Sequence, residues 1–237
     1  MPDSQTTPQA AVTPPEKPPW RLTIRDLLFL TTAMAVGLGL HLGYGHLQEA
    51  PRGVGEYLFY LAYAELSALA IMGSLMFGYR MVWAARPFRP SPGHWLLVLC
   101  AIDWIATTGA EWLASRMMNI QYFLWGLMWG VGIAMVCTVI VAIFFVRPAI
   151  WKAYLFLRAT LAAGTVLGAT PALFLYVYPW GYVAISGVEC LSSFALAGYA
   201  LRRRQLFHDR LQALGIAIVC GRSTLALISW VSVTPYW

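Results

Sequence analysis

Seven long apolar segments follow one another along the chain, separated by short polar or basic stretches. Each holds about twenty residues with few charges, which is the length that an α-helix needs to cross a hydrocarbon layer of about 30 Å. The pattern predicts an all-α polytopic bundle of about seven transmembrane helices, at 27–45, 57–79, 95–114, 122–146, 153–178, 181–201 and 211–231. Pro171 should kink the fifth helix, because proline lacks a backbone N–H.

The start of the chain has a different character. Residues 1–20 are rich in Pro, Gln, Thr and Ala and show no apolar period, which predicts a disordered, proline-rich cytoplasmic tail. Residues 21–237 then form the transmembrane domain. A cleaved signal peptide is the competing interpretation of the first apolar segment, but the long proline-rich leader and the weak cleavage signal favour a retained helix.

Basic residues are concentrated in alternate connections. Thirteen of them fall on one side of a seven-helix arrangement, and only Arg52 and Arg116 fall on the other. Because short loops rich in Lys and Arg remain in the cytoplasm, the N-terminus is predicted inside and the C-terminus outside. The thirteen are Lys17, Arg21, Arg25, Arg80, Arg86, Arg89, Arg147, Lys152, Arg158, Arg202, Arg203, Arg204 and Arg210.

Composition agrees with a membrane protein. Hydrophobic residues make up 59% of the chain and charged residues only 11%, against about 25% charged in a soluble domain. The net charge of +6 sits at helix ends, so the expected partner is the lipid bilayer and no nucleic acid. Cys100, Cys137, Cys190 and Cys220 lie in apolar segments without CxxC spacing, which predicts neither disulfides nor a zinc site.

Ionisable residues inside the apolar segments are the candidate functional positions, because each is costly in a membrane. They are Glu65, Asp103, Glu111, Glu189 and Arg222. Counted by helical rise, Glu65, Glu189 and Arg222 share nearly one height and Asp103 lies lower. Such a mid-depth polar layer suits a substrate or proton site, although a structural ion pair would give the same pattern.

Two further expectations concern individual helices. Asp103, Thr107 and Glu111 are spaced four apart, so they share one helix face and should point into the protein. Arg158 is close enough to the cytoplasmic end for its side chain to reach the interface.

The sharpest prediction is a buried ion pair between Glu189 and Arg222. Their helices are joined by a short basic loop and should be antiparallel neighbours, with the two residues level to within about one residue of rise. The planar guanidinium can hold a carboxylate bidentately. Glu65 is the alternative partner of Arg222 if the helix faces are rotated.

Small residues recur at four-residue spacing, which allows two helices to approach closely. The contact could lie within the bundle or form a homo-oligomer. The pairs are Gly39 and Gly43, Gly126 and Gly130, and Gly164 and Gly168.

The segment Arg21-Leu22-Thr23-Ile24-Arg25-Asp26-Leu27-Leu28, followed by an apolar helix, resembles the start of planctomycete multi-pass membrane proteins of unknown function. The resemblance covers the first predicted helix. It implies a bacterial inner-membrane location and no particular activity.

No sequence motif indicates a catalytic, cofactor-binding or metal-binding residue. The HExxH, GxSxG and GxxxxGK[ST] patterns are absent, and His41 is expected to be a packing residue. The function that the sequence favours is a small-molecule or ion binding or transport module. The alternatives are a structural or assembly protein, and a lipid-modifying enzyme with Asp103 and Glu111 facing the interface.

Overall fold

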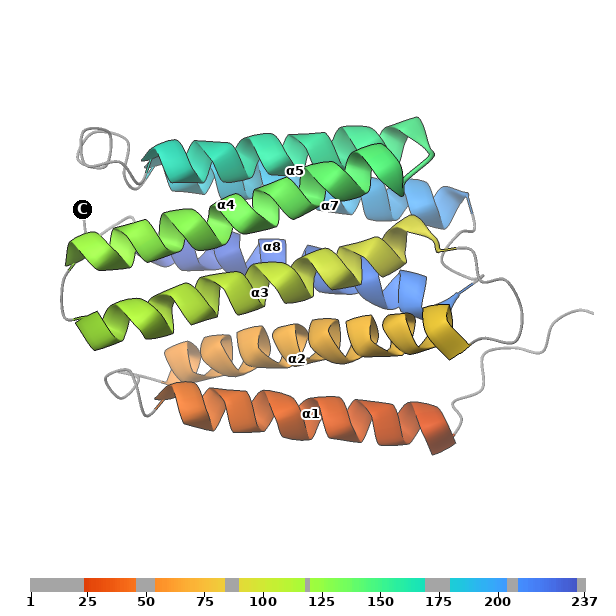
Figure 1. Ribbon diagram of the computed structural model, residues 1–237, viewed down its shortest axis with the longest axis horizontal. Coiled ribbons are helices and arrows are strands. Elements are labelled where there is room, and N and C mark those ends of the chain that lie inside the picture. The colour runs from red at the N-terminus through yellow and green to blue at the C-terminus, as the bar shows by residue number, and fades with distance from the viewer. Residues whose placement is uncertain are drawn as a thin grey trace, which may run out of the picture.

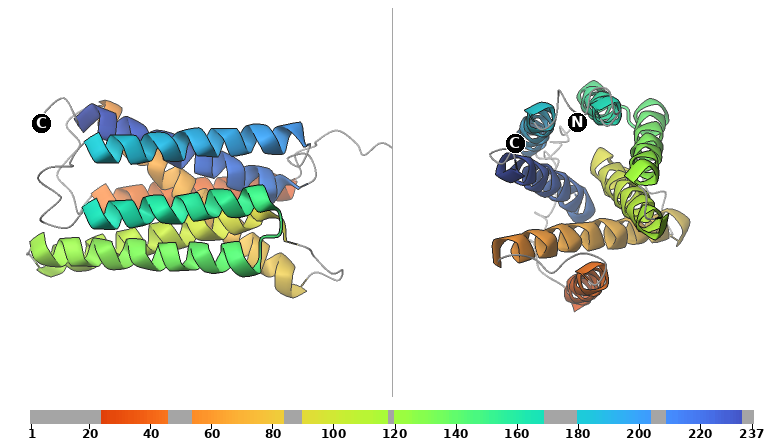
Figure 2. Two further views of the ribbon diagram at one scale, coloured as in Figure 1. Left: turned by 90° about the horizontal axis from the view of Figure 1, so that it is seen from above. Right: turned by 90° about the vertical axis from the view of Figure 1, so that its left-hand side faces the viewer.

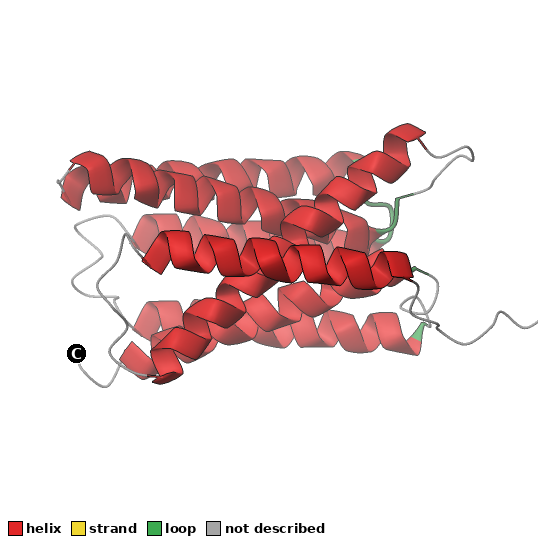
Figure 3. Ribbon diagram, turned by 90° about the horizontal axis from the view of Figure 1, so that it is seen from below, coloured by secondary structure: helices red, strands yellow, loops and turns green. Residues whose placement is uncertain are grey.

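The computed structural model is an all-α bundle. It describes residues 24–45, 54–83, 90–117, 120–168, 180–203 and 209–233, and within these ranges it contains seven helices and no strand (Figure 3). The helices are α1 (Ile24–Gly45), α2 (Val54–Trp83), α3 (Pro92–Met117), α4 (Ile120–Phe144), α5 (Ala149–Gly168), α7 (Trp180–Arg202) and α8 (Arg210–Val233).

Successive helices run in opposite directions (Figure 1). The starts of α1, α3, α5 and α8 and the ends of α2, α4 and α7 therefore lie together at one end of the bundle. We call it the basic end, since it carries Arg80, Arg147, Lys152, Arg202 and Arg210. Of the thirteen basic residues predicted on the cytoplasmic side, those that the structure describes thus lie at this end, except for Arg158, which lies farther along α5.

Three helices in the described part of the chain are long and apolar enough to cross a membrane: Tyr57–Trp83, Trp180–Arg202 and Arg210–Ser232. Shorter apolar stretches lie in α1, α3 and α4, at Leu27–Gly39, Pro92–Ala106 and Trp129–Phe144. Large apolar side chains are exposed on the outside of the bundle, including Trp129, Phe144 and Leu191. Such a surface is typical of contact with lipid or another protein.

The predicted helix positions agree with the observed ones to within a few residues for six of the seven. The fifth predicted helix ran to residue 178, whereas α5 is described as far as Gly168. Pro171 and the predicted tail at 1–20 lie outside the described residues.

Five helices form a ring, which is visible when the bundle is seen end-on (Figure 2). Neighbours in the ring are α3 with α4, α4 with α5, α5 with α7, α7 with α8, and α8 back with α3. Helix α2 packs on both α3 and α8, and α1 packs on α2 on the outer side. The first and last members of the ring, α3 and α8, are therefore held together from outside by α2.

Glycines allow the ring to close at the basic end. A side-chain carbon on Gly215 of α8 would overlap the carbonyl of Gly93 in α3, and one on Gly93 would overlap the backbone of Gln212. Both positions therefore require the absence of a side chain. Buried apolar residues continue the contact along the helices, among them Leu96, Leu97, Trp151, Leu155 and Ile218.

Two of the regularly spaced glycines, Gly39 and Gly164, make no such close approach. Gly39 has open space where a side chain would extend, and Gly164 lies at ordinary packing distance from Ile185 of α7. The close approach at Gly93 and Gly215 joins two helices distant in sequence, so no local spacing marks it. A homo-oligomer through the small-residue faces stays a prediction.

A buried charge cluster as the candidate functional site

Arg222 lies near the middle of α8 and has a nearly complete set of partners. Its Nη2 donates to Asp103 Oδ2 of α3 at 2.8 Å and to the Tyr63 hydroxyl of α2 at 3.0 Å, and its Nη1 donates to the Cys100 carbonyl at 2.8 Å. The guanidinium also lies over the Tyr63 ring, 5.3 Å from its centroid. With 11% of its side chain exposed, Arg222 joins α8 to both α3 and α2.

A second arginine, Arg158 of α5, enters the same cluster with longer contacts. Its Nε lies 3.6 Å from Glu189 Oε1 of α7, and its Nη2 lies 3.9 Å from Asp103 Oδ2. Its Nη1 is 3.9 Å from the Cys100 sulfur. Arg158 is 14% exposed, so it is about as enclosed as Arg222 but is held far less tightly.

The two carboxylates differ in how they bridge the ring. Asp103 faces both arginines, whereas Glu189 is paired with Arg158. Two arginines and two carboxylates balance in formal charge, which is the condition for enclosing charges at low cost. Each carboxylate side chain remains 26% exposed. The two carboxylates are therefore less enclosed than the two arginines.

The predicted ion pair between Glu189 and Arg222 is wrong: Arg222 pairs with Asp103, and Glu189 pairs with Arg158. The heights were estimated from helical rise, which does not fix the direction in which a side chain leaves its helix. The three polar partners of Arg222 described above lie on α2 and α3, so its side chain extends away from α7. Glu189 of α7 meets Arg158 of α5 instead.

Arg158 is the residue of the cluster that the sequence-based reasoning missed. It was expected to extend toward the nearest interface, yet it lies about 13 Å along α5 from its start at Ala149. The buried positions Trp151, Tyr154, Leu155 and Ala159 follow a helical period, and Arg158 lies on the same face. That periodicity was the available signal.

The remaining candidate residues fall into two groups. Glu65 faces α1 rather than the cluster, since a side chain on Gly37 would meet its carboxyl group. It therefore does not serve as the alternative partner of Arg222. Asp103 points into the protein as its polar stripe predicted, while the side chains of Thr107 and Glu111 lie outside the described part, as does that of His41.

Polar groups beside the cluster extend it along α5, α7 and α8. The Tyr154 hydroxyl lies 3.0 Å from Ser193 Oγ, and this Oγ also bonds to the Glu189 carbonyl at 2.7 Å. The Cys220 thiol donates to the Ser193 carbonyl. These contacts fix Ser193, which is one turn from Glu189 on the same helix.

A separate polar group lies at the basic end, where α3 and α8 begin. Asp209 accepts the Leu211 N–H at 2.9 Å, as a helix N-cap does. Its carboxylate also lies 3.1 Å from His94 Nε2 and 3.5 Å from Arg80 Nη1. Burial alone would raise the pKa of Asp209, but the contacts with His94, Leu211 and Arg80 outweigh it and lower that pKa.

Ser91, His94 and Asp209 resemble a hydrolytic triad only superficially. The backbone N–H of Ser91 donates to His94 Nδ1, and the Ser91 hydroxyl lies 2.5 Å from the same nitrogen. The backbone N–H of His94 donates to the Ser91 carbonyl, so these contacts close the first turn of α3. His94 is 1% exposed and lies against the ring of Phe77. The group therefore ties the start of α3 to that of α8 and leaves a substrate no access to the imidazole.

Comparison with protein-family models, with curated proteins and with solved structures finds no match to this chain. Among the described residues, no group of three or more His, Cys, Asp or Glu side chains could hold a metal ion. The charge cluster is accordingly the feature from which a function can be argued.

Proposed function

We propose that the seven helices cross a bacterial inner membrane, with the N-terminus in the cytoplasm and the C-terminus outside. Two observations support this topology: the helices alternate in direction, and the basic residues gather at one end of the bundle. The resemblance of residues 21–28 to the start of planctomycete inner-membrane proteins supports the location.

A reporter enzyme that is active only outside the cytoplasm tests this topology when it is fused after Trp237. We expect activity from the C-terminal fusion and none from the same reporter fused before Met1. A stably inserted C-terminal fusion without activity would overturn the assignment.

Within this membrane we propose that the ring binds a small organic anion together with a proton, as the binding step of a transport module. The observation that supports it is the loose pairing of Arg158, whose contacts measure 3.6–3.9 Å where those of Arg222 measure 2.8–3.0 Å. A cation that makes only long contacts can exchange its partner for a ligand at small cost.

The proton follows from the charge balance of the cluster. The two arginines and two carboxylates are already neutral in sum, so an added anion would leave one uncompensated charge in a low-dielectric site. When the anion takes Arg158, Glu189 loses its partner. Uptake of one proton together with the anion restores neutrality, and the ligand then enters as a weak acid.

Binding can be tested with the full chain in lipid nanodiscs. A panel of small carboxylates and phosphates is screened by thermal shift, and affinity is measured for each hit at several pH values. Because one proton accompanies each anion, affinity should rise by up to about tenfold per unit of decreasing pH. Arg158→Gln should abolish the shift, whereas Arg202→Gln, an exposed arginine at the basic end, should retain it.

The outcome that contradicts the proposal is equally concrete. If ligands bind with no dependence on pH, or bind Arg158→Gln as they bind the parent, the loose ion pair is not the binding element.

One observation favours a structural role for half of the cluster. Arg222 makes three short polar contacts that connect α2, α3 and α8, as an interhelical lock would. In the proposed transport module, Arg222 therefore keeps its protein partners, and Arg158 exchanges Glu189 for the ligand. A purely structural protein would show no ligand in the screen and equal destabilisation by loss of either arginine.

A further inference from the structure

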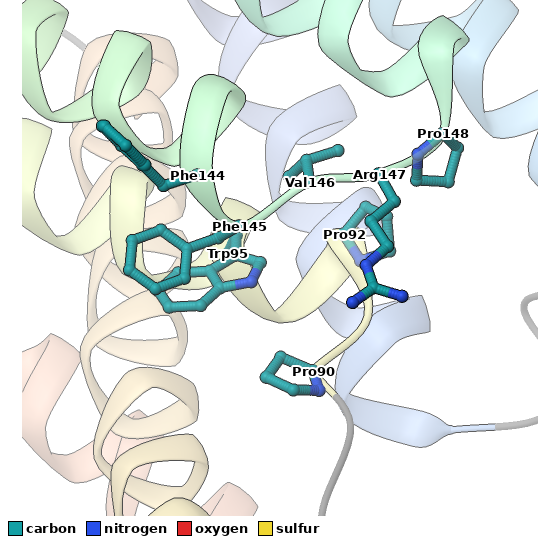
Figure 4. Close-up of a pocket in the computed structure, with 8 residues that line it drawn as sticks. All are labelled: Pro90, Pro92, Trp95, Phe144, Phe145, Val146, Arg147 and Pro148. Carbon is teal, nitrogen blue, oxygen red and sulfur yellow. The ribbon is translucent and has the colours of Figure 1, made fainter.

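A pocket of about 530 Å³ lies at the basic end, far from the charge cluster along the helices. It is enclosed by the chain entering α3, with Pro90, Pro92 and Trp95, and by the turn from α4 to α5 (Figure 4). The turn contributes Phe144, Phe145, Val146, Arg147 and Pro148. Its volume falls in the range of about 300–1,000 Å³ that small-ligand sites occupy.

Most of this lining is apolar. The three prolines have no N–H to offer, and the Trp95 ring packs on Phe145 with 4.4 Å between centroids. Phe144 and Phe145 are exposed on the outer side of the bundle. The pocket is thus continuous with an apolar surface that faces away from the ring, where a hydrocarbon chain would lie rather than water.

The two lining side chains with polar atoms, Arg147 and Trp95, are both donors. Arg147 is exposed and forms no ion pair with any residue in the described ranges. The buried Trp95 Nε1 has no acceptor there either. In Figure 4 the indole nitrogen of Trp95 is at the edge of the ring that is nearer to Arg147. Arginine and N–H donors together match the oxygens of a phosphate.

The start of α5 adds donors beside Arg147. The Trp151 and Lys152 N–H groups bond back to the Pro148 carbonyl, which leaves those of Ala149 and Ile150 without an intrahelical acceptor. A helix start favours negative charge through its unpaired N–H groups and its dipole. An anion at Arg147 would therefore be stabilised by the helix as well as by the side chain.

We propose that this pocket binds the headgroup of an anionic phospholipid from the leaflet at the basic end. The phosphate pairs with Arg147 and the acyl chains lie along Phe144 and Phe145. The apolar lining argues for a lipid rather than free phosphate, since it gains nothing from a soluble ion. The inference rests on the transmembrane placement proposed above but does not depend on a ligand in the charge cluster.

Native mass spectrometry of the full chain released from detergent micelles provides the test. The probes are phosphatidylglycerol, phosphatidylcholine with matched acyl chains, and glycerol 3-phosphate. The parent should retain phosphatidylglycerol in preference to phosphatidylcholine, and Arg147→Gln should weaken that retention about tenfold, as expected for one charge-assisted contact. Arg202→Gln, at the same end but outside the pocket, should bind as the parent does.

A second variant probes the indole donor. Trp95→Phe keeps an aromatic ring and removes the N–H, so it should reduce phosphatidylglycerol retention by a few-fold while leaving phosphatidylcholine retention unchanged.

Several results would overturn the site. Equal retention of the two lipids would show that no anion is recognised, and an equal loss in Arg147→Gln and Arg202→Gln would assign the effect to diffuse surface charge. Binding of glycerol 3-phosphate as tight as that of the lipid would identify an anion site without a lipid component. Arg158→Gln should retain phosphatidylglycerol as the parent does, and a ligand screen that finds nothing at the charge cluster would leave this site intact, so the two proposals fail separately.

Discussion

Two arginines inside the same helix ring have similar enclosure and a shared acid but very different surroundings. Asp103 Oδ2 lies 2.8 Å from Arg222 and 3.9 Å from Arg158. Arg222 also has a carbonyl and a hydroxyl within 3.0 Å, while Arg158 has only Glu189 and a sulfur at longer range. Residue type and burial therefore do not define the role of a charge. The number and length of its polar contacts define that role. They distinguish a structural arginine from one that can exchange its partner for a ligand.

The largest expected effect distinguishes these two directly. Arg222→Gln removes the 2.8 Å ion pair of Asp103 and frees the Cys100 carbonyl and the Tyr63 hydroxyl, so it should lower the free energy of unfolding by about 3–5 kcal/mol. Arg158→Gln should cost clearly less, because it removes only contacts of 3.6–3.9 Å. Unfolding in detergent can be followed with a thiol-reactive dye, since Cys100 and Cys220 are buried. Equal losses would remove the distinction.

Asp103 should come next, because it serves both arginines. In Asp103→Asn the amide oxygen still accepts from Arg222 but the charge is lost, and the cost should be roughly 1.5–3 kcal/mol, as for a hydrogen bond to a charged group. Glu189→Gln is the matched control and should cost less. A double-mutant cycle of Asp103→Asn with Arg222→Gln should show strong non-additivity. Additive losses would mean that the short contact contributes little.

Asp209 lies outside the charge cluster, so the stability lost on substituting it can be compared with the losses at Asp103 and Glu189. Asp209→Ala removes the N-cap of α8 and the contacts with His94 and Arg80, and should cost about 0.5–2 kcal/mol. The cap also predicts a pH dependence. The pKa of Asp209 is lowered in the folded chain from its ordinary 3.8, so the stabilisation is present above that value and is lost as pH falls through the lowered pKa.

Asp209→Asn isolates this dependence, because asparagine caps a helix about as well as aspartate. The stability difference between the parent and Asp209→Asn, measured by thermal unfolding, should be constant near neutrality and shrink in acid. A difference that grows as the pH falls would contradict the lowered pKa.

The smallest effect concerns the outer partner of Arg222. Tyr63→Phe removes the hydroxyl that accepts from the guanidinium and keeps the ring beneath it. The cost should be about 0.5–1.5 kcal/mol, and Tyr63→Leu, which also loses the cation–π contact, should cost more. If Tyr63→Phe is as harmful as Arg222→Gln, the hydroxyl rather than the ion pair fixes the arginine.

The helices could be predicted from sequence because each long apolar run is bounded by basic or proline-containing stretches. Capping residues such as Ser91 and Asp209 then fix where α3 and α8 begin. The face that each helix presents was harder to predict. Height alone paired Arg222 with Glu189, but the Arg222 side chain extends toward α2 and α3, a direction that height does not fix.

Two other features were beyond sequence reasoning for the same reason: they join segments distant in the chain. The close approach of Gly93 to Gly215 follows no local spacing, unlike the regular glycine pairs. The burial of His94 between Phe77 and Asp209 depends on α8 packing against α3. Arg158 is the exception, since the periodicity of α5 indicated its inward face.

The closure of the ring by its last helix has a consequence for biosynthesis. Asp103 and Arg222 are 119 positions apart in the chain, so a ribosome completes α3, α4, α5 and α7 before the partner of Asp103 exists. Until then the acid lacks its 2.8 Å ion pair, and Gly93 has no α8 to pack against. Such a long-range contact forms late and leaves earlier intermediates exposed. Chains that stall or terminate before α8 would therefore expose an unclosed ring, which quality-control proteases could recognise and degrade.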